Sequence, residues 1–308
     1  MNIFVRLRNA YESGGIFEVA RKTYYHVLYM YNGKKIVSKV LKAKCEYGIK
    51  KDTTGGQKII VSMTTYPKRF SDLELCLKSL VLQTVKPDKI IVYLGADSTG
   101  VELPSNIKRF EEYGVEFRVD EKINLRSYKK FFYAMQDYPE DVVITADDDI
   151  IYPHDWVESL VSSYKKYPNA ISARRVHMMR LQGEQIAPYN SWRDQYRRER
   201  KPCNALFPTG CSGVLYPPHS LDERAFDKDI FMDICTNADD VWLKCMALLN
   251  GYPTVWVPNN VIDLPEVENS YATALQNNNV GENMNDIYLE KVMKKFQIEP
   301  QQFFENVK

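Results

Sequence analysis

Two groups of acidic residues have the chemistry to bind a cation and to accept a proton. Asp147, Asp148 and Asp149 follow an apolar run, and Asp239 and Asp240 open a segment with helical spacing. Three adjacent carboxylates stay ionised together most easily around a cation, and their hard oxygen atoms favour Mg²⁺ or Mn²⁺. Two neighbouring carboxylates push their pKa values apart, which suits a general base. The alternatives are a solvated acidic turn for the first group and a helix-capping pair for the second.

The strands that would hold these acids are predicted by short apolar runs. Continuous runs at 58–63, 90–94 and 141–146 have strand length, and residues 115–119 alternate as a shorter strand does. Ligands of parallel sheets bind at the carboxyl ends of the strands, and the first acidic group directly follows the run at 141–146. The sequence therefore predicts a ligand site at that sheet edge.

Helical patterns alternate with these strands. A capping-box pattern at 71–74 precedes leucines at helical spacing, and further helices are predicted over 128–138 and 238–250, the last ending at Gly251. Alternating strands and helices predict an α/β fold with a mostly parallel sheet flanked by helices. Beyond about residue 177, frequent prolines indicate loops and short elements that suit a substrate-binding face.

Composition and charge limit the classes of protein to which this chain can belong. The 308 residues are 44% hydrophobic and 26% charged, as in a globular protein, and no 18-residue apolar run indicates a membrane-spanning helix. The formal charge of +1 gives no sign of a nucleic-acid partner. Six cysteines are scattered without a CxxC pair, so neither a disulfide framework nor a zinc site is indicated. We expect a cytoplasmic, reduced protein.

The N-terminal segment is strongly basic. Residues 1–51 contain 11 Lys and Arg and 3 acids, a charge of +8, which leaves −7 for the other 257 residues. The segment is also rich in aromatic residues, so it could contact an anionic membrane at its inner face. The alternative is a helical arm packed on the main domain. A breaker at 53–56 predicts an extension over 1–56 and one domain over 57–308, with a nucleotide-binding half (57–176) and a substrate-binding half (177–308).

Three motifs in this order and spacing carry a family resemblance. Thr64–Arg69 after the first strand, Asp147–Asp149 after the fourth, and Asp239–Asp240 before a helix ending at Gly251 resemble a GT-A glycosyltransferase. The most similar group is the family 2-like enzymes of bacterial capsule, lipopolysaccharide and other surface-polysaccharide loci. The resemblance runs from about residue 58 to about residue 258. It implies a metal-dependent, inverting transfer of a sugar from a nucleotide diphosphate, expected to be a UDP-sugar, to a hydroxyl of a glycan or lipid-linked glycan.

The resemblance also implies roles for single residues. Asp147 and Asp149 resemble the DxD carboxylates that hold Mn²⁺ or Mg²⁺, and Asp240 resembles the catalytic base. Asp239 stands where a glutamate is usual, which leaves open which carboxylate acts. The residues expected to bind the donor are Thr64, Tyr66, Arg69, Asp97, Lys130, Asp147 and Asp148. Those expected to bind the acceptor are Trp192, Gly210 and Ser212.

Several of these positions have a structural alternative. Asp97 could be a turn residue, Lys130 a solvated helical lysine, and Trp192 a core residue. Lys129 competes with Lys130 for the diphosphate, and the loop at 209–213 could be a plain tight turn.

Two other functions use similar features. A nucleotidyltransferase would be expected to carry a glycine-rich phosphate loop after the first strand, and residues 64–67 contain no glycine. A catalytically inactive, carbohydrate-binding relative could keep the fold. Metal-dependent release of nucleoside diphosphate from a nucleotide sugar would distinguish an active transferase from such a binding protein.

Overall fold

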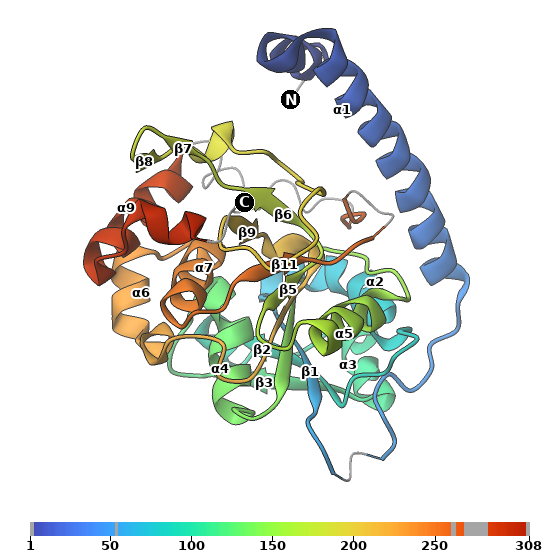
Figure 1. The fold of residues 1–308 in the computed structure, drawn as a ribbon. Helices are drawn as coiled ribbons and strands as arrows, with labels where there is room; N and C mark the ends of the chain where they lie inside the picture. Colours follow the sequence, from blue (N-terminus) through green and yellow to red (C-terminus); the bar gives the residue numbers. More distant parts are fainter. Residues whose placement is uncertain (1–2, 53–54, 260–262, 268–282, 306–308) are drawn as a thin grey trace.

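The computed structural model describes residues 3–52, 55–259, 263–267 and 283–305. Within these ranges, seven strands form one sheet in the order β11-β5-β10-β4-β1-β2-β3 (Figure 1). Their bounds are β1 (Ile59–Thr64), β2 (Lys89–Leu94), β3 (Val115–Val119), β4 (Val142–Ala146), β5 (Ile171–Ala173), β10 (Val214–Tyr216) and β11 (Thr254–Trp256). Two short antiparallel pairs lie outside this sheet, β6 (Val176–Met178) with β9 (Leu206–Pro208) and β7 (Leu181–Gln182) with β8 (Gln185–Ile186).

One strand of the sheet runs against the others. β10 is antiparallel to both of its neighbours, with Val214 opposite Thr145 of β4 and Ala173 of β5. The remaining pairs are parallel. All strands except β10 therefore end at the same edge of the sheet. The predicted mostly parallel sheet flanked by helices is confirmed, and so is a helical N-terminal segment.

Helices cover both faces of the sheet because its strands are apolar on both sides. Val61 and Met63 of β1 pack into one hydrophobic cluster, while Ile60 packs into another. The first face is covered by α2 (Phe70–Val81), α3 (Ser105–Lys108) and α5 (Trp156–Lys166). The second is covered by α4 (Lys129–Asp137), with α6 (Lys228–Ile234), α7 (Asp239–Leu249) and α9 (Met284–Phe296) extending its core.

The predicted elements agree with this structure except at one helix start. The four predicted strands and the helices at 128–138 and 238–250 are confirmed, with bounds shifted by a residue or two. Gly251 has a φ of +74°, as a C-terminal glycine cap requires. The capping box at 71–74 was wrong. A short 3₁₀ helix, Pro67–Arg69, leads directly into α2, and the Ser71 hydroxyl bonds to the Asp72 carboxylate.

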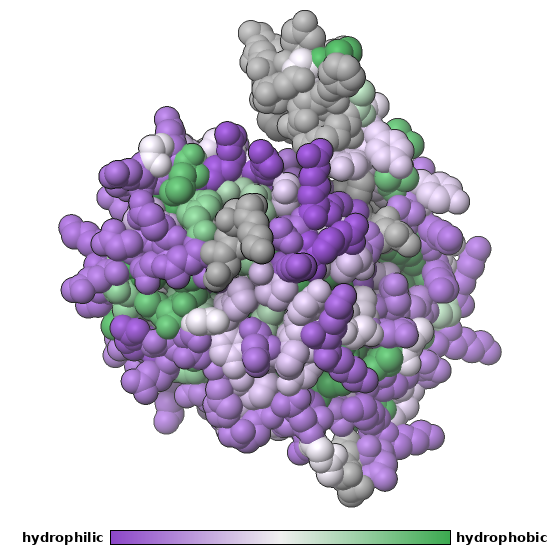
Figure 2. Space-filling model, viewed as in Figure 1, coloured by the Kyte–Doolittle hydropathy of each residue, from purple (hydrophilic) through white to green (hydrophobic). Residues whose placement is uncertain are grey.

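The basic N-terminal segment forms one long helix, α1 (Ile3–Lys42), that stands off the body of the protein (Figure 1). Its C-terminal end packs on the domain through Ile36 and Val40, which are buried against the α2 side of the core. Tyr24, Val27 and Tyr31 are exposed, and Figure 2 shows apolar side chains among hydrophilic ones along this helix. Among the described residues, no helix is both long and apolar enough to span a membrane. Residues 1–2 of the extension and 53–54 of the predicted breaker lie outside the described residues.

Candidate active site

The first acidic group lies at the carboxyl end of β4, beside the loop that follows β1. The Thr65 hydroxyl donates to Asp148 Oδ2 at 2.7 Å. Arg69 Nη1 donates to Asp148 Oδ1 at 2.9 Å and to Asp149 Oδ2 at 2.7 Å. Because β1 and β4 are parallel neighbours, their ends bring the Thr64–Arg69 motif against the acids. No role was predicted for Thr65, although it directly follows Thr64 at the end of the predicted strand.

The Asp148 carboxylate accepts hydrogen bonds from other side chains of the protein. Asp148 is buried, and burial raises the pKa of its carboxyl to about 6 against the opposing charge of Arg69. Both of its oxygen atoms accept hydrogen bonds, one from Thr65 and one from Arg69. Its carboxylate therefore joins the loops after β1 and β4.

Lys130, from the first turn of α4, links the two acidic groups. Its Nζ lies 2.8 Å from Asp147 Oδ1 and 3.0 Å from Asp239 Oδ2. The side chain is buried, so the alternative of a solvated helical lysine is wrong. Burial alone would lower its pKa, but Asp147, Asp239 and Asp240 raise it well above its ordinary value. Lys130 is therefore a fixed positive charge between β4 and α7.

Lys129 is also buried, but it lies in a different environment. Its Nζ donates to the amide oxygen of Asn124 at 3.0 Å, and burial lowers its pKa despite the charges of Asp97 and Asp148. Of the two neighbouring lysines, Lys130 is the one that forms ion pairs with the acids.

Asp240 is held by the backbone of the loop before β10. The Gly210 N–H lies 3.0 Å from both carboxylate oxygens of Asp240. A Cβ on residue 210 would lie 3.0 Å from Asp240 Oδ1, so glycine permits this close approach. Burial and the charge of Asp239 raise the pKa of Asp240 to about 7, while Lys130 opposes the rise. A carboxylate with such a pKa can accept a proton near neutral pH.

Three further donor-site candidates lie on the same edge of the sheet. Thr64 ends β1 and donates from its hydroxyl to the Tyr93 carbonyl at 2.9 Å. Tyr66 is half-buried, with the Arg69 guanidinium 5.8 Å from its ring centre. Asp97 is exposed in the turn after β2, and its charge acts on Lys129.

The acceptor-site candidates divide into two kinds. Gly210 and Ser212 are both buried in the loop beside Asp240, and the Ser212 carbonyl accepts from the indole N–H of Trp156 at 2.8 Å. Trp192 is only 7% exposed, and its indole N–H donates to the Ala187 carbonyl at 2.7 Å. Packing against neighbouring aromatic rings places Trp192 in the core, so it does not form the exposed sugar platform expected from the sequence.

A half-buried arginine beside these loops was not predicted from the sequence. Arg175 Nη1 donates to the Thr209 hydroxyl at 3.0 Å, and its Nε lies 3.1 Å from Asp263 Oδ1. Burial alone would lower its pKa, but nearby groups, Cys211 and Asp263 among them, raise it above its ordinary value. Because these contacts join residues 34 and 88 positions apart, no local motif marks them.

Asp147 and Asp149 fit a hard divalent cation. Their side chains are 28% and 20% exposed, and each has one oxygen in an ion pair, with Lys130 or Arg69, which leaves a second oxygen outside these pairs. Burial and the charge of Asp147 raise the pKa of Asp149. A bound cation would therefore stabilise the ionised form of this carboxylate. In the described part of the chain, no group of three or more His, Cys, Asp and Glu could hold a metal alone. Mg²⁺ commonly takes one or two carboxylates and completes its shell with phosphates and water.

A comparison with protein families finds one match. The profile described as "Glycosyl transferase family 2" matches residues 60–218, which is just over half of the chain. The match contains β1, β4, the first acidic group and the Gly210 loop, and it ends before Asp239. No curated protein shows significant similarity to this chain.

Solved structures with a similar arrangement have low sequence identity. The mannosyltransferase PcManGT from Pyrobaculum calidifontis, in complex with GDP-Man and Mn²⁺, is 13% identical over 93% of this chain and 77% of that chain, with a TM-score of 0.49. S. aureus TarS 1-349, in complex with UDP, is 12% identical over 62% of this chain and 55% of that chain, with a TM-score of 0.43. A 4-diphosphocytidyl-2C-methyl-D-erythritol synthase is 12% identical over 70% and 97%, with a TM-score of 0.39.

Proposed function

This chain belongs to glycosyl transferase family 2, and from that premise we propose that it transfers a sugar from a nucleotide-diphosphate donor to an acceptor hydroxyl. The observation that carries the proposal is the position of Lys130, which pairs with Asp147 at the end of β4 and with Asp239 at the start of α7. Asp147 and Asp239, which are 92 positions apart, thus both pair with the buried ammonium group of Lys130. Such an arrangement supports a leaving-group side and a base side in one cleft.

Asp240 is the proposed general base. Its pKa of about 7 lets it take the proton of a sugar hydroxyl as that hydroxyl attacks the anomeric carbon. The Gly210 N–H, bonded to both oxygens, fixes the carboxylate in place. Asp239 faces Lys130, which leaves Asp240 as the carboxylate beside the acceptor loop. Attack with one base in line with the leaving diphosphate inverts the anomeric centre.

The donor side is proposed to lie over the ends of β4 and β1. Thr64, Tyr66 and Asp97 border the space for the nucleoside, and Arg69 holds Asp149 in position. Lys130 places positive charge where negative charge grows on the leaving diphosphate. Asp147 and Asp149 would hold Mn²⁺ or Mg²⁺, which when bound supplies Lewis-acid stabilisation of the diphosphate.

The proposal also covers the identity of the donor and the acceptor, the acceptor loop and the role of α1. We take the donor to be a UDP-sugar and the acceptor a surface glycan or lipid-linked glycan. Gly210 and Ser212 form the acceptor loop, and α1 holds the protein against an anionic membrane. Exposed lysines and aromatic residues along α1 support that last assignment, since both favour the surface of such a membrane.

A panel of nucleotide sugars tests the proposal. In the presence of Mn²⁺, at least one donor should raise the melting temperature of the protein and release nucleoside diphosphate. A chelator should abolish the release, and added Mn²⁺ should restore it. A protein that neither binds nor cleaves any nucleotide sugar, with or without an acceptor glycan, would contradict the proposed function.

A further inference from the structure

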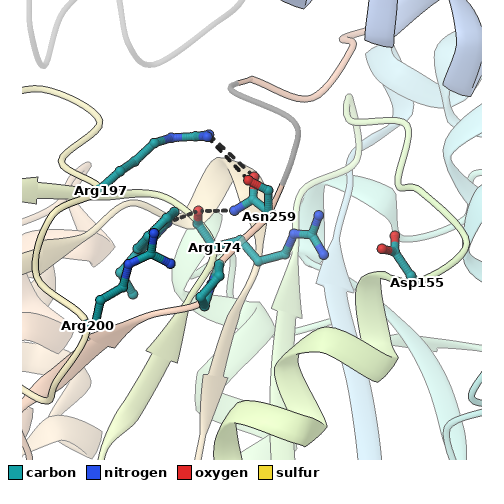
Figure 3. Close-up of a pocket in the computed structure, with 7 residues that line it drawn as sticks. Asp155, Arg174, Arg197, Arg200 and Asn259 are labelled. Carbon is teal, nitrogen blue, oxygen red and sulfur yellow. Dashed lines mark hydrogen bonds between the residues drawn. The ribbon is translucent and has the colours of Figure 1, made fainter.

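A pocket lies at the same edge of the sheet as the acids, beyond β10. It has a volume of about 390 Å³, and its lining includes Arg174, Arg197, Arg200, Trp256 and Asn259 (Figure 3). Arg174 directly follows β5, and Trp256 ends β11. Because β5 and β11 run in the same direction as β4, the pocket opens on the edge that carries the candidate active site.

Arg174 brings a buried positive charge to this pocket. The residue is 4% exposed, and its side chain has one hydrogen bond in the structure, from Nη1 to the neutral hydroxyl of Ser159. No carboxylate of the described residues lies within ion-pair distance of it. Burial lowers the pKa of Arg174 to about 10, with Asp155 opposing the effect and Arg197 adding to it. A bound anion would supply the missing negative charge.

The other two guanidinium groups also contact residues that line the pocket. Arg197 donates to the backbone and side-chain oxygens of Asn259 at 3.3 and 3.4 Å, contacts that Figure 3 shows as dashed lines. The Arg200 guanidinium lies 4.5 Å from the ring centre of Trp256. The Trp256 indole N–H and the Asn259 amide both donate to the Arg174 carbonyl, so one small network positions all three arginines.

We propose that this pocket binds a phosphate group. The residues that line the pocket include three arginines and one acid, the exposed Asp155, so the formal charge of this lining is +2, opposite in sign to a phosphate dianion. Guanidinium groups fixed by their neighbours bind phosphate oxygens with charge-assisted hydrogen bonds at little cost in side-chain entropy. The pocket is separate from the proposed donor site, because β10 lies between β4, which the first acidic group follows, and β5, which Arg174 follows.

The phosphate has two candidate sources, a phosphate-bearing acceptor and free inorganic phosphate. Arg175, next in the chain to Arg174, bonds to Thr209, and Thr209 precedes the glycine that holds Asp240. The pocket is thus linked by short contacts to the proposed base. An acceptor source rests on the proposed function, whereas phosphate binding itself does not.

Calorimetric titration of the full chain with inorganic phosphate, without donor or metal, tests the pocket. Arg197→Gln and Arg200→Gln should each weaken binding at least about tenfold, the effect of losing a charge-assisted hydrogen bond. Arg198→Gln is the matched control, because it removes the same charge from an exposed position in the same segment that does not line the pocket. Absence of phosphate binding by the wild type, or equal weakening in all three variants, would overturn the proposal.

Vesicles distinguish the two sources. Phosphatidylcholine vesicles containing phosphatidic acid present a phosphate monoester at a membrane surface. If they bind the wild type, are displaced by inorganic phosphate and bind Arg200→Gln more weakly, the pocket takes a lipid-borne phosphate. If only inorganic phosphate binds in this Arg200-dependent way, the pocket takes free phosphate. Loss of nucleotide-sugar turnover with phosphate binding intact would count against the proposed function alone, and the reverse result against the pocket alone.

Discussion

Replacing Lys130 with methionine tests whether this lysine joins the two acidic groups. The variant keeps an unbranched apolar side chain of similar length but removes the charge that lies 2.8 Å from Asp147 and 3.0 Å from Asp239. Breaking a buried ion pair by removing one partner costs about 3–5 kcal/mol, because the other charge stays buried and unpaired. Asp147 is 28% exposed and partly screened by solvent, so the low end, about 3 kcal/mol, applies.

The neighbouring lysine provides the matched control. Lys129 is equally buried, but its ammonium has the neutral Asn124 amide as its hydrogen-bond partner, so Lys129→Met should cost about 1 kcal/mol or less. At about 2 °C of melting temperature per kcal/mol for a protein of this size, Lys130→Met should melt about 6 °C lower and Lys129→Met about 2 °C lower. Differential scanning calorimetry measures both values.

The same variant should change the pH dependence of activity. Asp240 must be ionised to accept a proton, so kcat/KM should fall as the pH drops below about 7. The positive charge of Lys130 lowers the pKa of Asp240, and its removal should therefore move this acidic limb upward by about one pH unit. Equal melting temperatures for the two lysine variants, together with an unmoved acidic limb, would refute the reasoning about Lys130.

A glycine substitution and a fourfold lysine replacement test other parts of the site and the N-terminal helix. Gly210→Ala places a Cβ 3.0 Å from Asp240 Oδ1, so we expect kcat to fall about tenfold with a small change in melting temperature, measured by initial rates and calorimetry; unchanged kcat would mean that Asp240 tolerates displacement. Replacing four exposed lysines of α1 with glutamine (Lys34, Lys35, Lys39 and Lys42) should weaken binding to anionic vesicles at least about a hundredfold in a sedimentation assay, at about 1 kcal/mol for each charge. The same change at four exposed lysines of the body (Lys122, Lys291, Lys294 and Lys295) should have little effect, and equal losses would reject α1 as the contact.

Local sequence patterns predicted the parts of the fold that depend on nearby residues. The run at 90–94 is a buried strand because its own composition favours burial between two helical layers, and the acids after 141–146 lie at a strand end for the same reason. Local patterns of this kind do not predict the order of the central strands in the sheet. β10 has three residues and is fixed by its pairing with strands about 40 and 70 positions earlier in the chain, so no local periodicity indicates it.

The contacts within the site were less predictable than its location. Asp148 bonds to Thr65 and Arg69 across about 80 positions, and a sequence shows only that three acids are adjacent. Trp192 was assigned to a sugar surface because its residue type suits that role, yet its burial depends on β9 and on Tyr189 packing around it. Arg174 and Arg175 follow each other in the chain and serve different clusters, a difference that their positions alone do not reveal.

The central claim is that two acidic groups in one cleft have separate tasks, donor binding at Asp149 and proton acceptance at Asp240. Donor affinity and turnover of Asp149→Ala and Asp240→Asn, measured side by side with the same nucleotide sugar and Mn²⁺, test it most directly. We expect Asp149→Ala to lose donor binding, and Asp240→Asn to bind the donor within about threefold of wild type while kcat falls at least about a hundredfold. Full turnover by Asp240→Asn, or the same loss of donor affinity in both variants, would contradict the account.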